Sequence, residues 1–305
     1  MPIPWGVWFE PARPVRRIVE LAQIAEAEGA SVCLVADEGT DRDVFVALTA
    51  VLLATDRISV GPAITNPFSR HPVASAAAIA TLTEMAPGRV WHGLGVGGSR
   101  VMGPMQFRPT KPFTALREAV DLTRELLAGR PVGPAHLPWA PGPVPLAMGG
   151  RGPRSQALAA ANADWVILSA EIVADLPQTA ARLRAPGDAK VAWSAYLVLT
   201  AEDRRRVMKH FTYMAIDAPL EIRQLVGLDD GTTERVRAEV LAGRTDRAAE
   251  LLPDGLVDVY AVAGSPEECA QTIKDLRPHF DMFLLPLNDE ETDEHQLATA
   301  AEICR

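Results

Sequence analysis

The sequence predicts an α/β protein, a single (β/α)8 barrel of the TIM-barrel class with insertions. Short apolar runs rich in β-branched and aromatic residues alternate along the chain with longer segments of helical pattern. The first three runs begin about every 27 residues, a spacing typical of repeated βα units. Each run is apolar on both faces, as expected for parallel strands covered by helices. Eight such runs are present, and eight strands close a barrel. An open doubly wound sheet is the alternative, but the GxGxxG fingerprint that usually follows its first strand is absent here.

The expected elements alternate along most of the chain. The predicted strands span residues 5–9, 32–36, 58–64, 90–95, 144–148, 165–169, 191–200 and 281–287. Helices are expected at residues 13–28, 43–55, 72–85, 111–128 and 266–276, and further helices start at Pro153, Asp175 and His295. Pro153 suits a first helical position, where its missing N–H would have no partner in any case. The acidic run at residues 289–294 suits the N-terminus of the last helix.

All 305 residues are expected to form one domain, because α/β barrels often reach this length. A mostly helical, polar insertion occupies about residues 201–257, before the last strand. Residues 130–142 are rich in proline and glycine, and we expect them to cross the barrel mouth rather than to separate two domains.

Composition excludes several classes of function. The chain is 48% hydrophobic and 23% charged, with no apolar stretch of the ~18 residues that a membrane span needs. Its start resembles no signal peptide, so a cytoplasmic protein is expected. A net charge of −9 disfavours nucleic acid and leaves a small molecule as the expected partner. Three widely spaced cysteines indicate neither a disulfide framework nor a zinc site, and no metal site is predicted.

Residues 61–72 form the most unusual connection in the chain. Asn66 and His71 each precede a proline, which favours an extended backbone and predicts a stiff ridge between the third strand and the next helix. Such a ridge could form one wall of a site for a flat ligand. A tight surface crossover with incidental prolines is the alternative reading.

The ends of the predicted strands carry the other candidate site residues, because active sites of βα barrels lie at the carboxyl ends of their strands. Asp37 and Glu38 follow the second strand and are candidates for proton transfer or ligand contact, although a helix cap or an ion pair with Arg42 explains them equally well. Two glycine clusters follow the fourth and fifth strands, and their N–H groups could line a phosphate. These clusters contribute Gly95, Gly97, Gly98, Ser99, Gly150, Arg151 and Gly152. Because no helix is expected between the first cluster and about Lys111, we do not interpret it as a dinucleotide fingerprint.

These motifs resemble the luciferase-like flavin and deazaflavin oxidoreductases, and within them the coenzyme F420-dependent methylenetetrahydromethanopterin reductase group. The TNP-x-x-RHP element within residues 61–72 is the specific match, and the glycine motifs support it. The matching segments occur in the family's order at residues 34–38, 61–72, 79–82, 87–90, 93–97, 148–153 and 261–267.

The resemblance implies a luciferase-like barrel, usually a homodimer, that holds coenzyme F420 at its mouth and transfers a hydride between C5 of the deazaflavin and an unidentified small organic substrate. It implies a non-prolyl cis peptide between Ala63 and Ile64 behind the central ring, with Thr65 and Asn66 beside the ring's polar edge. Residues 97–99 and 150–152 would then lie near the phosphate of the coenzyme tail. An FMN-dependent monooxygenase of the same fold, and a non-catalytic barrel that binds a flavin, remain as alternatives.

The chain also departs from the reductase. It has Trp8 and Gly98 where the resemblance places two carboxylates beside the pterin, which puts methanopterin in doubt as the substrate. Some deazaflavin dehydrogenases of the family carry a histidine after the second-strand aspartate, where this chain has Glu38.

The helices at residues 43–55 and 72–85 carry long runs of small and apolar residues with almost no charge. A helix on the outside of a barrel normally shows a polar stripe to water. We therefore expect a two-fold homodimer built on these helices, unless neighbouring segments of the same chain cover them.

Overall fold

The computed structural model describes residues 2–103, 105–106, 108–150, 152–216, 218–287 and 292–305. Its central sheet has eight parallel strands in the order β3-β2-β1-β10-β7-β6-β5-β4. The strands are β1 (Trp5–Phe9), β2 (Val32–Val35), β3 (Ser59–Pro62), β4 (His92–Leu94), β5 (Leu146–Gly149), β6 (Trp165–Ser169), β7 (Lys190–Ser194) and β10 (Met282–Leu287). The predicted fold class is confirmed.

The barrel closes between β3 and β4 at two points on either side of a bulge. Single bridges join Val60 to Val90 below the bulge and Thr65 to Leu94 above it. The bulge holds a cis peptide bond between Ala63 and Ile64, as the family resemblance implied. Gly93 permits this close approach, because a Cβ atom at this position would lie 1.8 Å from the carbonyl oxygen of Pro62.

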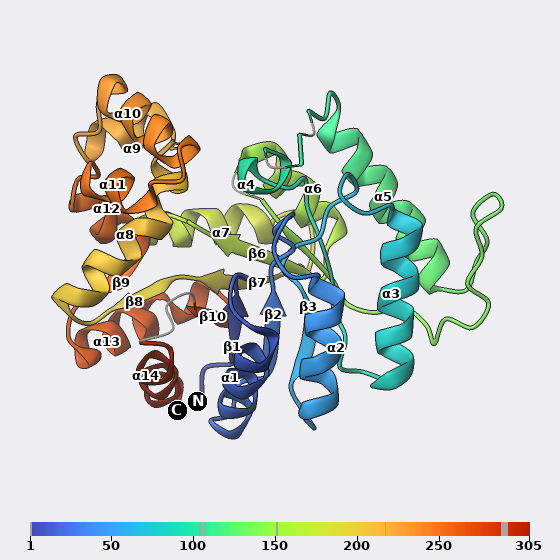
Figure 1. The fold of residues 1–305 in the computed structure, drawn as a ribbon. Helices are drawn as coiled ribbons and strands as arrows, with labels where there is room; N and C mark the ends of the chain where they lie inside the picture. The colour runs from blue at the N-terminus through green and yellow to red at the C-terminus, as the bar shows by residue number, and fades with distance from the viewer. Residues whose placement is uncertain (1, 104, 107, 151, 217, 288–291) are drawn as a thin grey trace.

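Helices surround the barrel, and the two chain ends lie side by side at its foot (Figure 1). These helices are α1 (Val15–Ala27), α2 (Val44–Ala54), α3 (Pro72–Met85), α4 (Ser99–Met102), α5 (Pro112–Leu127), α6 (Pro153–Asn162), α7 (Leu176–Arg184), α13 (Pro266–Leu276) and α14 (Asp293–Cys304), with two short 3-10 turns at Val173–Asp175 and Arg277–His279. The N–H of Ile3 donates to the carbonyl of Cys304 over 2.8 Å and joins the ends. None of the described helices combines the length and apolar character that a membrane crossing would need.

The expected insertion is a helical subdomain that stands beside the barrel mouth, at the left of Figure 1. It comprises α8 (Ala201–Ile216), α9 (Leu220–Leu225), α10 (Asp230–Leu241), α11 (Thr245–Glu250) and α12 (Gly255–Tyr260). Two short parallel strands, β8 (Tyr196–Val198) and β9 (Ala261–Ala263), join it to the barrel. The single strand expected at 191–200 is therefore divided, because the chain leaves the barrel after Ser194 and pairs with β9, which was not predicted.

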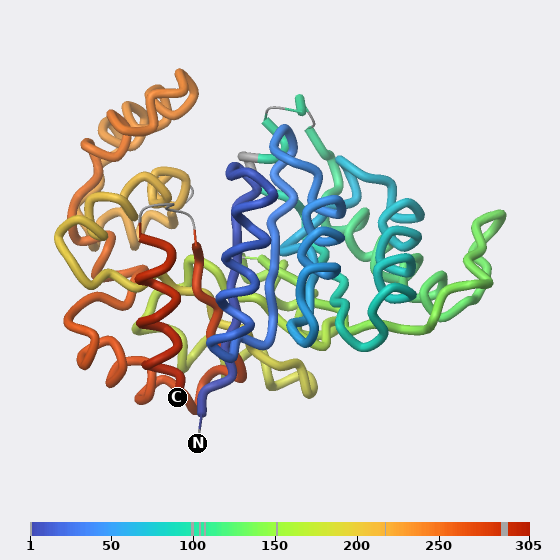
Figure 2. Tube along the Cα trace, turned by 60° about the horizontal axis from the view of Figure 1, so that its bottom comes forward, coloured from blue at the N-terminus to red at the C-terminus, as the bar shows by residue number. Residues whose placement is uncertain are grey.

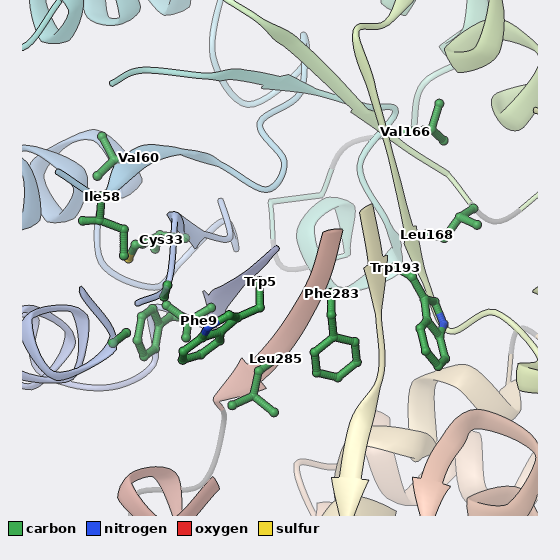
Figure 3. Packing of buried hydrophobic residues seen from close by; sticks show 14 of the residues in the cluster. Trp5, Phe9, Cys33, Ile58, Val60, Val166, Leu168, Trp193, Phe283 and Leu285 are labelled. Carbon is green, nitrogen blue, oxygen red and sulfur yellow. The ribbon is translucent and has the colours of Figure 1, made fainter. Parts of the chain in front are cut away.

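Side chains alternate between the barrel interior and the layer beneath the helices. Val32 and Leu34 of β2 pack inside with residues of β5, β6, β7 and β10, whereas Cys33 and Val35 pack outward. Figure 3 shows part of the outer layer, including Trp193 and Phe283. Trp91 and Trp165 stack with ring centroids 4.8 Å apart near the amino ends of the strands. Side chains thus fill the barrel interior near the amino ends of the strands, and the free space lies at the mouth, at their carboxyl ends.

Two expectations about loops are wrong. Residues 130–142 connect the end of α5 to the start of β5, so they lie at the amino ends of the strands, opposite the mouth. They project from the side of the molecule as the green loop at the right of Figure 2. The first glycine cluster leads directly into the one-turn helix α4, so a helix does follow it before Lys111.

Candidate active site

One cavity of about 420 Å³ opens at the carboxyl ends of the strands, between the barrel and the helical subdomain. Residues from nearly every strand end contribute to it, together with α8 and α12. Its lining is Trp8, Glu10, Ala36, Asp37, Glu38, Ala63, Ile64, Val96, Gly97, Gly98, Val101, Gly149, Gly150, Ile167, Ser169, Ala170, Ser194, Tyr196, His210, Tyr213, Met214, Tyr260 and Pro286. Its size is that of a pocket for a small molecule or a cofactor ring.

The bulge at Ala63 and Ile64 forms an apolar wall on one side of this cavity. The indole Nε1 of Trp8 donates to the carbonyl oxygen of Ala63 over 2.9 Å and fixes the bulge from β1, two strands away. The Ile64 side chain lies on a bed of glycines: a Cβ atom at Gly95 would be 1.8 Å from Ile64 Cδ1, and one at Gly149 would be 3.4 Å from it. We call Ala63 and Ile64 the bulge wall.

Buried hydrogen bonds support the bulge wall from behind. The hydroxyl of Thr65 donates to Asp37 Oδ2 over 2.6 Å. Burial raises the pKa of Asp37, while the Thr65 hydrogen bond and the charge of Arg70 act against that rise. Asn66 closes a turn, since its Oδ1 accepts from the backbone N–H groups of Phe68 and Ser69 over 2.9 Å each.

Glycines form the rim beside this wall. Gly97 has φ +70°, a conformation that favours glycine, and a Cβ atom there would lie 2.3 Å from Met102 Cε. Gly98 faces open space, because nothing lies within 4 Å of a Cβ atom built on it. On β5's side, Gly150 packs against Ser155, whose hydroxyl donates to the carbonyl of Gly152 at the start of α6. Gly152 is the N-cap residue of α6, and Pro153 begins the helix as the sequence predicted.

The opposite side of the cavity is polar and aromatic. Glu10 follows β1, Tyr196 begins β8, and His210 and Tyr213 project from α8. His210 Nδ1 lies 3.9 Å from Glu10 Oε1, and the imidazole stacks on the ring of Tyr196 with centroids 5.5 Å apart and planes 16° apart. Together with Tyr260 of α12, these residues form what we call the aromatic wall.

The predicted site residues fall into four groups. Seven line the cavity: Asp37, Glu38, Ala63, Ile64, Gly97, Gly98 and Gly150. Four others, Thr65, Asn66, Gly95 and Gly152, lie beside or beneath it and do not line it. Ser99 starts α4, and only its backbone is described. Arg151 lies outside the described residues.

The sequence interpretation missed the aromatic wall. Glu10 carried a usable signal, since it directly follows the first strand, where barrel active sites draw their residues. His210 and Tyr213 carried none, because a polar residue on an amphipathic helix is ordinarily a solvated one. They line the cavity only because α8 packs over the barrel mouth, which their local sequence does not indicate.

Comparisons with known proteins agree with this fold. Residues 3–279 match the model of a family described as luciferase-like monooxygenase. The 5,10-methylenetetrahydromethanopterin reductase of Methanolobus tindarius is 27% identical over 293 residues, which covers 89% of this chain and 90% of that protein. Among solved structures, the coenzyme F420-dependent tetrahydromethanopterin reductase of Methanopyrus kandleri superposes with a TM-score of 0.85 at 19% identity, over 99% of this chain and 98% of that one. An F420-dependent secondary alcohol dehydrogenase in complex with an F420–acetone adduct gives a TM-score of 0.73 at 19% identity, with coverage of 99% and 98%. From the family match over most of its length, the chain belongs to the luciferase-like monooxygenase family.

Proposed function

We propose that this protein is a coenzyme F420-dependent oxidoreductase that transfers a hydride between the deazaflavin and a small organic substrate. The bulge wall carries the proposal, because it presents a rigid apolar surface at the mouth of a barrel whose cavity has the size of a cofactor ring. The Methanolobus tindarius reductase is similar over 89% of the chain, and the solved structure of the Methanopyrus kandleri reductase has a related fold.

The residues present fit such a cofactor. Ala63 and Ile64 would back the ring system, with Trp8 holding the bulge carbonyl. Gly98 leaves the cavity open where any side chain would fill it. The N-terminus of α6 supplies backbone N–H groups and a favourable helix dipole for an anionic tail, and Gly152 lets the chain turn into it.

The protein's part in the reaction is to position the cofactor ring and to enclose the reacting groups. When bound, a deazaflavin accepts or donates a hydride at C5. Trp8, Ile64 and the glycine bed define the plane against which the ring lies. The aromatic wall covers the opposite side of the cavity and restricts water around the reacting carbon.

The substrate is proposed to differ from methylenetetrahydromethanopterin. Trp8, which stands in place of a carboxylate of the reductase group, uses its indole N–H on the bulge and cannot accept a hydrogen bond from a pterin. Gly98 offers no side chain at the second such position.

A titration of the purified protein with coenzyme F420, FMN and FAD tests the cofactor. Tighter binding of F420 is the expected result. Preference for FMN would favour an oxygen-dependent monooxygenase, which the family description also admits, and would refute the deazaflavin proposal. Binding of F420 without turnover of any substrate would favour a carrier or sensor.

A matched pair of glycine variants tests the place of the ring. Gly98→Val should weaken F420 binding by at least about tenfold, equivalent to about 1.4 kcal/mol, because the new side chain enters the cavity. Gly187→Val is the control, since Gly187 also has free space around its Cβ position and does not line the cavity. Equal affinities in the two variants would place the cofactor elsewhere.

A further inference from the structure

Two serine side chains form part of the floor of the main cavity. Ser169 and Ser194 end β6 and β7, two positions after Ile167 and Ala192, which point into the barrel interior. Because side chains alternate along a strand, both serines point inward as well, one layer nearer the mouth. They are partners in the register of the two parallel strands and so lie side by side. Both line the cavity.

The hydroxyl of Ser194 has no hydrogen-bond partner among the described residues. The residue is only 9% exposed. A buried hydroxyl without a partner costs free energy, because it has given up its hydrogen bonds to water. Since Ser194 lines the cavity, a bound ligand would supply the missing hydrogen bond. Ser169 likewise has no partner within the described part of the chain.

The strand order places the two serines in a continuous polar segment of the mouth. Strands β2, β1, β10, β7 and β6 are neighbours in that order. Carboxylates follow the first two of these strands, and the serines end the last two. We use the name polar arc for Glu10, Asp37, Glu38, Ser169 and Ser194. The bulge wall and the glycine rim follow β3, β4 and β5 and occupy the rest of the mouth.

Ser194 faces the bulge wall across the cavity. In the closed eight-stranded order, β7 and β3 are four strands apart and therefore lie opposite each other. Ser194 ends β7, and the bulge wall follows β3. A cofactor ring that lies against the bulge wall therefore leaves the polar arc to the substrate.

The described residues that line the cavity make it negatively charged. Their three carboxylates all belong to the polar arc, and no lysine or arginine is among these described lining residues. Carboxylates are ordinarily ionised at pH 7. Even if His210 is protonated and Asp37 is not ionised, Glu10 and Glu38 leave the described lining negative. An anionic substrate would be repelled here, whereas a cationic one is attracted.

The aromatic wall adds rings that favour the same charge. Tyr196 and Tyr260 both lie edge-on to the ring of Phe211, with centroids 5.7 Å and 6.1 Å from it. Phe211 is fully buried in the core of the helical subdomain, so it braces both tyrosines before any ligand binds. Tyr213 lines the cavity beside them. Aromatic faces attract ammonium ions, most strongly where water is excluded.

Resting on the proposed function, we propose that the polar arc binds a substrate that carries an ammonium group and no phosphate or carboxylate, and that Ser194 accepts a hydrogen bond from this substrate. Carboxylate oxygens only accept hydrogen bonds and a serine hydroxyl accepts as well as donates, so both suit the three donors of an ammonium group. The aromatic wall suits an apolar or aromatic body on the same molecule.

Three probes of similar size separate recognition of a positive charge from recognition of a hydroxyl or an anion. They are benzylammonium, benzyl alcohol and benzoate, and their dissociation constants are measured by ligand-observed NMR on cofactor-free protein at pH 7 and low ionic strength. Benzylammonium should bind at least about tenfold more tightly than benzyl alcohol, and benzoate most weakly. Added salt should narrow the difference. Equal affinities for benzylammonium and benzyl alcohol, tighter binding of benzoate, or no measurable binding of benzylammonium would each overturn the inference.

A matched pair of serine variants tests Ser194. Ser194→Ala should weaken binding of benzylammonium by about tenfold without lowering the melting temperature, because no hydrogen bond within the described chain is lost. Ser75→Ala is the control, since Ser75 also has a buried hydroxyl without a partner among the described residues and does not line the cavity. Equal affinities in the two variants would remove Ser194 from the site.

A carboxylate variant tests the charge. Glu38→Gln should weaken binding of benzylammonium and leave that of benzyl alcohol nearly unchanged, because it removes a negative charge and keeps the shape of the side chain. Equal effects on the two probes would show that the charge of Glu38 is not recognised, which contradicts the inference.

The outcomes separate this inference from the proposed function. Failure of the protein to bind F420 would refute the proposed function, whereas the probe affinities are measured without cofactor. In F420-loaded protein, benzylammonium should keep its affinity, because the bulge wall and the polar arc occupy different parts of the mouth. Displacement of benzylammonium by F420 would assign the polar arc to the cofactor and overturn the inference, while the proposed function would stand.

Discussion

His92 offers a sharp test of the energetics of this fold, because it is a fully buried titratable group. It begins β4 and is 1% exposed. Neither ring nitrogen has a hydrogen-bond partner among the described residues. Burial lowers the pKa of His92 from 6.5 to about 4, because the charged ring would lose its hydration.

The sign and size of the effect follow from that shift. In the unfolded chain the ring takes up a proton below pH 6.5, while in the folded protein it stays neutral down to about pH 4. The contribution of the neutral ring to the free energy of unfolding is therefore fully present above pH 6.5. It is lost progressively as the pH falls toward 4. At pH 5, which is 1.5 units below 6.5, the loss is about 2 kcal/mol at 1.36 kcal/mol per unit.

Two substitutions isolate this contribution. His92→Leu removes both the titration and the buried polar atoms, and His92→Gln removes the titration while keeping polar atoms in place. The free energy of unfolding is measured by urea denaturation at pH 7.5 and pH 5. Between pH 7.5 and pH 5, the free energy of unfolding of the wild type should fall by about 2 kcal/mol more than that of either variant. The contributions of other titratable groups are common to all three proteins and cancel in the comparison. Equal losses in all three proteins would refute the account of His92 as a buried neutral group.

Three further predictions concern the site and the surface. Thr65→Val should raise the pKa of Asp37 further and destabilise the fold by about 1–3 kcal/mol at pH 7, with a smaller loss at pH 4, where less of the carboxyl is charged; equal losses in urea at both pH values would contradict this. Asp293→Asn should cost about 3–5 kcal/mol in urea denaturation, because Arg13, 5% exposed, would lose its buried ion-pair partner; a cost below about 1 kcal/mol would contradict it. The homodimer stays a prediction: Val46, on the apolar α2, is 64% exposed in the single chain, so light scattering should give twice the monomer mass for wild type and the monomer mass for Val46→Glu, and a monomeric wild type would contradict it.

The barrel itself could be predicted because its signals are local. Apolar runs at βα spacing give the strands, and Asp43 and Pro72 mark helix starts that the structure reproduces at α2 and α3. The division of the strand after Ser194 was not predictable in this way. Residues 191–200 are mostly apolar, and only pairing with the distant β9 decides that the chain leaves the barrel there.

The bulge wall could be predicted through the resemblance of residues 61–72, but the reason for its glycines could not. Gly95 was expected to approach a ligand, whereas the structure shows that it makes room for the Ile64 side chain. A glycine that accommodates a ligand and one that accommodates a neighbouring side chain have the same sequence signature. Only the position of Ile64 distinguishes them.

The aromatic wall could not be predicted from the sequence, because it depends on a contact between distant segments. Glu10 and His210 are 200 positions apart, and their pairing depends on how the helical subdomain packs over the mouth. No local propensity encodes such a contact, because it arises between an insertion and a strand end. The bulge wall, by contrast, lies within one short connection and can be recognised by its motif. Under the proposed function, the cofactor would lie against the bulge wall, which is built from local motifs, and the substrate would border the aromatic wall, which depends on an insertion. Sequence resemblance would then report the cofactor more readily than the substrate.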